Sequence, residues 1–273
     1  PKPEDRVYLR LHVDAGSFAE TDSQAGMAHF LEHMAFNGSD NFPAGTLIEW
    51  FQDHGMSFGA DTNAHTAFSE TVYKLDLPNR DEKTLREGML VMSDFAKGMT
   101  ISDNEVQSEK GVIDGEQRER DSAGYRVLVQ GLERQYKGTL LAKRLPIGTK
   151  PVRDAFTGES VREFYTKWYR PENMTMVIVG DLRGYNPEDL IAEFFEGFAG
   201  PGTPVANEPA MGKPKQDDLT FLVSDAEIPS LQLTIANLKP YAHQKDTVAQ
   251  RSDDIALMVA HSMLGQRFSE AVK

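Results

Sequence analysis

The chain has 273 residues, of which 40% are hydrophobic, so it can form one large domain or two ordinary domains with a sizeable core. Its formal net charge of −13 argues against nucleic-acid binding as the main role. The absence of cysteine excludes disulfide bonds and thiolate metal ligands, and no apolar run approaches the length of a membrane span.

The first predicted elements are a strand and a helix. Apolar and polar residues alternate over residues 7–13, which is typical of a half-buried strand. Residues 25–36 contain no proline or β-branched residue, and Gly38 follows as a C-terminal stop, so this stretch predicts a helix.

The predicted helix carries the inverted zinc motif H-x-x-E-H at His29, Glu32 and His33. Helical spacing places the three side chains within an arc of about 100°. Both imidazoles can therefore reach one zinc ion, and Glu32 lies close enough to take a proton from an activated water. A solvated helix face is the alternative, and the short motif alone does not decide between them.

The rest of the chain predicts alternating strands and helices. Further strands are expected at residues 58–66, 69–77 and 174–179, the last of them buried, and helices at 46–54, 84–97, from 102 onward, 160–168 and 187–198. Helices packed on a mainly antiparallel sheet give an α+β fold of the α/β-sandwich type.

A catalytic zinc site needs a third protein ligand, which must here be His, Asp or Glu. The best candidates are Glu109 and Glu116, two turns apart on one face of the helix that follows residue 102. Val112 and Ile113 lie between them, which indicates that this face is not simply solvated. An ordinary charged helix is the alternative.

Several motifs, in order, resemble those of the pitrilysin/insulysin family of zinc peptidases, the inverzincins. They occupy residues 14–17, Glu20, and residues 26–38, 58–66, 109–116, 145–148 and 168–181. The resemblance runs from about residue 7 to the end of the chain and implies a zinc-dependent endopeptidase acting on unfolded peptides or small polypeptides.

The resemblance also implies a role for each site residue. His29, His33 and Glu116 match the zinc ligands, Glu32 matches the catalytic base, and Glu109 matches a residue that supports the site without binding zinc. The interval from His33 to Glu116 looks a few residues longer than the family's interval between the second histidine and the third ligand. By that interval alone, Glu109 fits the third ligand better. The local pattern around both glutamates still favours Glu116, and the three ligands are expected to converge on one point.

Residues 60–66 resemble the family strand that receives extended substrate along its edge. Asn63, Ala64, His65 and Thr66 are therefore candidate substrate-binding residues, with affinity expected mainly from the peptide backbone. On that basis Thr66→Ala is expected to matter little. An ordinary core strand is the alternative.

The composition changes at residues 200–216, where the stretch 201–215 contains four prolines and two glycines and predicts a linker. Residues 1–199 are expected to form the zinc-binding catalytic domain. Residues 217–273 are expected to begin a second, truncated domain of the same repeated fold without a zinc site. Its predicted elements are strands at 220–224 and 231–238 and a helix at 253–268, on which His261 is expected to be a core residue.

The resemblance implies that groups from a second half of the molecule complete the site. The chain is therefore expected to need its missing C-terminal half or a partner subunit, and it begins without methionine or a signal-peptide pattern, as a trimmed fragment would. A non-catalytic homologue acting in peptide binding or subunit assembly is the alternative function, although such relatives typically have a broken zinc motif. The resemblance favours a periplasmic or other extracytoplasmic bacterial location.

Overall fold

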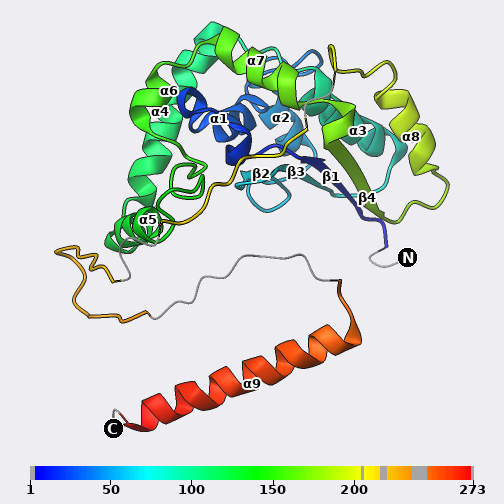
Figure 1. Cartoon of the computed structure of the whole chain (residues 1–273). Helices are drawn as coiled ribbons and strands as arrows, with labels where there is room; N and C mark the ends of the chain where they lie inside the picture. The colour runs from blue at the N-terminus through cyan, green and yellow to red at the C-terminus, as the bar shows by residue number, and fades with distance from the viewer. Residues whose placement is uncertain (1–3, 204–205, 216–219, 235–244, 272–273) are drawn as a thin grey trace. The chain divides into compact units, whose positions relative to one another are not determined.

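The computed structural model describes residues 4–203, 206–215, 220–234 and 245–271, and the chain divides into two compact units, residues 1–229 and 230–273 (Figure 1). The first unit contains the sheet and nearly all of the helices. Within the described ranges, no helix has both the length and the apolar character needed to cross a bilayer.

The first unit is built on a four-stranded antiparallel sheet of order β2-β3-β1-β4. Its strands are β1 (Val7–Val13), β2 (Thr62–Thr66), β3 (Thr71–Leu77) and β4 (Met174–Gly180). In β1, alternate residues are fully buried, with Leu9 opposite both Leu75 and Ile178. The α+β fold predicted from the alternating pattern is confirmed.

The other elements described in this unit are helices and short turns. They are α1 (Met27–Met34), α2 (Thr46–Asp53), α3 (Glu82–Lys97), α4 (Asp103–Arg120), α5 (Ala123–Gln135), α6 (Lys150–Asp154), α7 (Gly158–Trp168) and α8 (Pro187–Phe194), with short 3-10 turns at Ser17–Ala19, Asp22–Gln24 and Pro171–Asn173. Helices α1 and α3 pack on the strands, and α4 and α7 pack against α1 (Figure 1). Helix α1 therefore lies between the sheet and a second layer of helices, where packing fixes its orientation.

Three features of the first unit differ from the sequence predictions. The helix expected from residue 102 ends at Arg120, and Ser122 caps a separate helix, α5, which the predictions lack, as they lack α6. Strand β2 begins only at Thr62, because residues 57–61 form a turn closed by the Asp61 side chain on Ser57.

The third difference concerns β4, which was predicted to be a buried strand. Val177 and Val179 are 40% and 58% exposed, so this part of the prediction is wrong. Strand β4 is the last strand of the sheet, and only its Met174, Met176 and Ile178 side packs on the core. A continuous apolar run does not reveal whether one or both faces of a strand are covered.

The second unit contains helix α9 (Val248–Ala271), which confirms the helix predicted at 253–268 and extends it. Residues 220–224 and 231–234 form no strand, and residues 235–238 of the second predicted strand lie outside the described part of the chain. A strand needs a hydrogen-bonded neighbour, and these described segments have none. His261 is exposed rather than in a core, because α9 has no buried residue in the structure.

Candidate metal centre

The start of α1 is held by a buried carboxylate. Gly26, at φ +97°, precedes the helix, and Glu20 accepts hydrogen bonds from the backbone N–H groups of Gly26 and Ala28, each at 2.9 Å. Burial raises the pKa of Glu20 to about 8, against the lowering effect of these hydrogen bonds. Two of the orphan N–H groups at the helix start are thereby satisfied, which fixes the helix that carries the histidines.

His29, His33 and Glu116 converge from two helices. The Nε2 atoms of His29 and His33 lie 3.4 and 3.3 Å from the same Glu116 oxygen, Oε2. The three candidate ligand atoms all lie within 4.8 Å of one another. Helix α1 thus contributes the two histidines and α4 contributes Glu116, because the two helices pack against each other.

This arrangement fits a zinc ion. Two ligand atoms at about 2.05 Å from a tetrahedral zinc lie roughly 3.3 Å apart, which matches both nitrogen–oxygen separations. Glu116 Oε2 is buried, and no group in the described ranges makes a hydrogen bond of good geometry to it. Two imidazoles and one carboxylate are also a donor set of catalytic zinc sites, which keep a fourth position open.

Glu109 occupies a different place from Glu116. Its Oε1 lies 2.7 Å from His33 Nδ1, and its Oε2 accepts a hydrogen bond from the Asn37 side chain at 2.5 Å. Glu109 therefore contacts the side of the His33 ring that faces away from Glu116. A carboxylate in this position fixes the ring orientation and leaves Nε2 available to a metal when the ring is neutral.

The charges of the cluster are strongly coupled. Burial lowers the pKa of His33, but the hydrogen bond to Glu109 and the nearness of Glu116 outweigh it and raise that pKa to about 9. His29 and His33 in turn hold the pKa of Glu116 well below its usual range. Without a metal, the cluster therefore holds a proton where a cation would bind.

Glu32 directly precedes His33 on α1 and is also buried. Its Oε2 accepts a hydrogen bond from Thr66 Oγ1 at 2.5 Å, which joins α1 to β2. The position of the Glu32 carboxylate is thus set both by α1, which carries it, and by the hydroxyl of Thr66 on β2.

Strand β2 lies at one end of the sheet, and its hydrogen-bonding pattern indicates which backbone groups face the free edge. The bond from Asp76 N to Asp61 O identifies residue 61 as a hydrogen-bonded position, so residues 63 and 65 bond to β3 and Ala64 and Thr66 face outward. Thr62 is already used, because its carbonyl accepts a bond from Gly59. The open part of the edge is therefore residues 63–66.

The four candidate substrate-binding residues divide between the two faces of β2. Ala64 packs on the core and Thr66 contacts Glu32, whereas Asn63 and His65 are exposed on the opposite face. The Ala64 N–H donates to the Asn63 side chain at 2.9 Å, so a peptide pairing here must displace that amide.

Sequence reasoning missed several contacts of this site. Arg120 pairs with the other oxygen of Glu116, and its i,i+4 spacing on α4 was a usable signal. The contacts of Asn37 with Glu109 and of Thr66 with Glu32 join distant elements, and no local pattern announces them.

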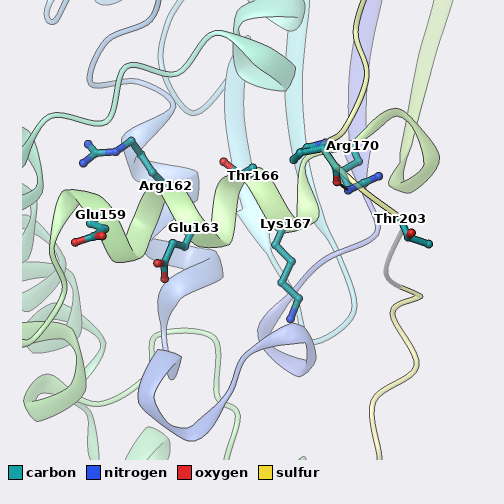
Figure 2. A pocket seen from close by; sticks show the side chains of 8 residues that line it. Glu159, Arg162, Glu163, Thr166, Lys167, Arg170 and Thr203 are labelled. Atoms are coloured by element: carbon teal, nitrogen blue, oxygen red, sulfur yellow. Dashed lines mark hydrogen bonds between the residues drawn. The ribbon is translucent and has the colours of Figure 1, made fainter.

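A separate hollow lies outside this cluster. It measures about 460 Å³ and is lined by Glu159, Arg162, Glu163, Thr166, Lys167, Arg170, Pro201 and Thr203. Figure 2 shows that the labelled side chains do not converge on one point: they are spread along α7 from Glu159 to Lys167, with Arg170 and Thr203 outside the helix. Two of the lining side chains, Arg162 and Arg170, donate to the backbone carbonyls of Ile101 and Pro201.

Comparison with known proteins gives family matches over nearly the whole chain. A family model described as "Insulinase (Peptidase family M16)" matches residues 1–144, and one described as "Peptidase M16 inactive domain" matches residues 155–273. The "Probable zinc protease PqqL" of Escherichia coli is 38% identical over 66% of this chain and 19% of its own length. The "Zinc protease PQQL-like" of Arabidopsis thaliana is 28% identical over 91% of this chain and 27% of its own length.

Solved structures agree with these matches. The crystal structure of the periplasmic protease PqqL from Escherichia coli superposes with a TM-score of 0.72 at 33% identity, covering 77% of this chain and 23% of that one. The first half of the same protease gives a TM-score of 0.71 and covers 45% of that chain. The present chain thus spans only about a fifth to a quarter of the curated relatives that it matches.

Proposed function

The chain belongs to peptidase family M16, and from this premise we propose that it carries the zinc-binding, catalytic part of an endopeptidase that hydrolyses unfolded peptides or small polypeptides. The observation that carries the proposal is the convergence of the His29 and His33 Nε2 atoms on one buried oxygen of Glu116. In this proposal residues 1–199 form the catalytic domain, residues 200–216 a linker, and residues 217–273 the beginning of a second domain.

The chain's residues have separate tasks in the proposed reaction. His29, His33 and Glu116 would hold zinc, which when bound polarises the scissile carbonyl and makes water a better nucleophile. Glu32 takes the proton of the attacking water and returns it to the leaving amine. Glu109 keeps the His33 ring oriented through the contact with Nδ1.

The free edge of β2 is the proposed substrate site. A peptide that pairs with residues 63–66 meets the outward backbone groups of Ala64 and Thr66, next to the strand contact with Glu32. Backbone pairing tolerates many sequences, which suits an enzyme for unfolded chains. Methylating the substrate amides near the scissile bond should therefore weaken binding strongly, whereas an unchanged Michaelis constant would exclude strand addition.

The remaining length of the protein matters for activity. The relatives are four to five times longer than the stretch matched here, so we propose that the C-terminal half or a partner subunit completes the active site. One solved relative is a periplasmic protease, which supports an extracytoplasmic location for this protein too. Hydrolysis should therefore be assayed with the whole protein rather than with this chain alone.

Two variants separate metal binding from chemistry. Glu32→Gln should retain zinc while hydrolysis falls by roughly 10²–10⁴-fold, the usual contribution of a general base. His33→Ala should instead lose the metal, and Glu119→Gln, an exposed change on α4, is the control that should alter neither property. Equal zinc loss in the Glu32 and His33 variants would make Glu32 a ligand. Bound zinc with no hydrolysis that depends on Glu32 would favour the alternative, a homologue for peptide binding or assembly.

A further inference from the structure

We propose that Thr66 is a positioning residue for the general base, which it serves by holding the carboxylate of Glu32 through its hydroxyl group. The inference rests on the proposed function, because it assumes that Glu32 takes a proton during hydrolysis. It differs from the expectation drawn from the sequence, in which Thr66 only pairs with substrate and its side chain matters little.

The geometry of the contact supports this role. Thr66 Oγ1 donates to Glu32 Oε2 at 2.5 Å, within the range of a charge-assisted hydrogen bond between a hydroxyl and a carboxylate. Glu32 is only 7% exposed, so little water competes for this oxygen. A hydrogen bond to a buried charged group is among the stronger single contacts that a side chain makes.

Thr66 is itself held in place. It lies opposite Thr71 in the β2–β3 ladder, with the two Oγ1 atoms 3.4 Å apart. Thr71 is buried and donates to the Ala15 carbonyl at 2.9 Å. A β-branched side chain also has few rotamers in a strand, so the hydroxyl of Thr66 has little freedom to leave the carboxylate.

The contact distinguishes the two oxygens of the base. Oε2 of Glu32 accepts the hydrogen bond from the Thr66 hydroxyl, which leaves Oε1 to take the proton of the attacking water. A carboxylate without this anchor can rotate about its terminal bond, which has broad rotational preferences. The hydroxyl therefore contributes to the orientation of the base, a term that affects the rate of the chemical step rather than substrate affinity.

The same residue also faces the proposed substrate. The backbone N–H and C=O of Thr66 point to the free edge of β2, while its side chain points to α1. The backbone of Thr66 thus sets the register of a paired peptide, while its side chain sets the position of the base Glu32. A peptide bond docked on this strand is placed relative to Glu32 through a single, rigid connection.

The test compares Thr66→Val, which keeps the shape and loses the hydroxyl, with Thr66→Ser, which keeps the hydroxyl. Both are made in the whole protein, and kcat, KM and zinc content are measured with an unstructured peptide. Thr66→Val should lower kcat by about 10–100-fold, the effect of losing one hydrogen bond to a charged group, with KM and zinc content within about twofold. Thr66→Ser should recover most of kcat. Thr175→Val, at an exposed position of β4, is the matched control and should leave kcat unchanged.

A double variant connects the effect to the base. In a Glu32→Gln background, Thr66→Val should cause little further loss, because the group that it positions has already been removed. If Thr66→Val proves unfolded by circular dichroism, the comparison of Thr66→Ala with Thr66→Ser answers the same question.

The outcomes separate this inference from the proposed function. An unchanged kcat in Thr66→Val, or a rise in KM alone, overturns the positioning role while a large effect of Glu32→Gln leaves the peptidase proposal standing. A loss in Thr66→Ser as large as in Thr66→Val also overturns it, since the hydroxyl would then not be the cause. Full activity of Glu32→Gln overturns both proposals together.

Discussion

Removal of the Glu109 carboxylate is the most direct test of how the proposed zinc ligands are supported. Glu109 makes two short contacts, to His33 Nδ1 at 2.7 Å and to the Asn37 side chain at 2.5 Å, and it is buried. Outer partners of metal-binding histidines typically contribute 10–100-fold to metal affinity, which corresponds to about 1.4–2.7 kcal/mol. Glu109→Gln keeps an acceptor for His33 and should fall near the lower end of this range. Glu109→Ala leaves both partners unpaired and should reach the upper end.

The assay is competition for zinc against a chromophoric chelator, with unfolding by urea measured in parallel. Glu119→Gln removes one charge from an exposed position of the same helix and is the control for long-range electrostatics. A change in zinc affinity below about twofold in Glu109→Ala would refute a supporting role. Complete zinc loss, as expected for His33→Ala, would instead make Glu109 a direct ligand, which the longer interval from His33 to Glu116 left open.

Two further predictions follow from the metal cluster and its supporting helix. The pKa of His33 in the metal-free protein is raised to about 9, so zinc must displace a proton from His33 at lower pH. The association constant for zinc should therefore rise roughly tenfold per pH unit up to about pH 9. Calorimetric titration with zinc between pH 7 and 10 checks this slope, and an affinity that does not change with pH contradicts it. Gly148→Ala should destabilise the protein and weaken zinc binding, because Gly148 has φ +65° and an added Cβ would lie 2.2 Å from the Ala25 carbonyl oxygen at the start of α1. Gly184→Ala, at φ +89° in open space, should lose only the roughly 1 kcal/mol of backbone strain in urea denaturation, and an equal loss in both variants would refute the clash.

Local sequence patterns determined the elements that carry the candidate site most closely, although they missed α5 and α6. The alternation of residues 7–13 predicted β1 to the residue, and the helix formers around the H-x-x-E-H motif predicted α1 to within two residues at each end. The same spacing predicted that His29 and His33 share a face, and their rings lie 4.7 Å apart in the structure. These features depend on helix and strand periodicity, which acts over a few residues and is therefore visible in the sequence.

Only the tertiary structure decided how the distant parts meet. Glu109 and Glu116 share one helix face, so periodicity could not separate them. The packing of α4 on α1 places Glu116 at both Nε2 atoms and Glu109 at His33 Nδ1. The contact of Thr66 with Glu32 depends on where the edge strand lies relative to α1, and the exposure of β4 depends on its place at the end of the sheet. Such contacts join residues tens of positions apart, so their physical cause is the packing of whole elements, which no local pattern encodes.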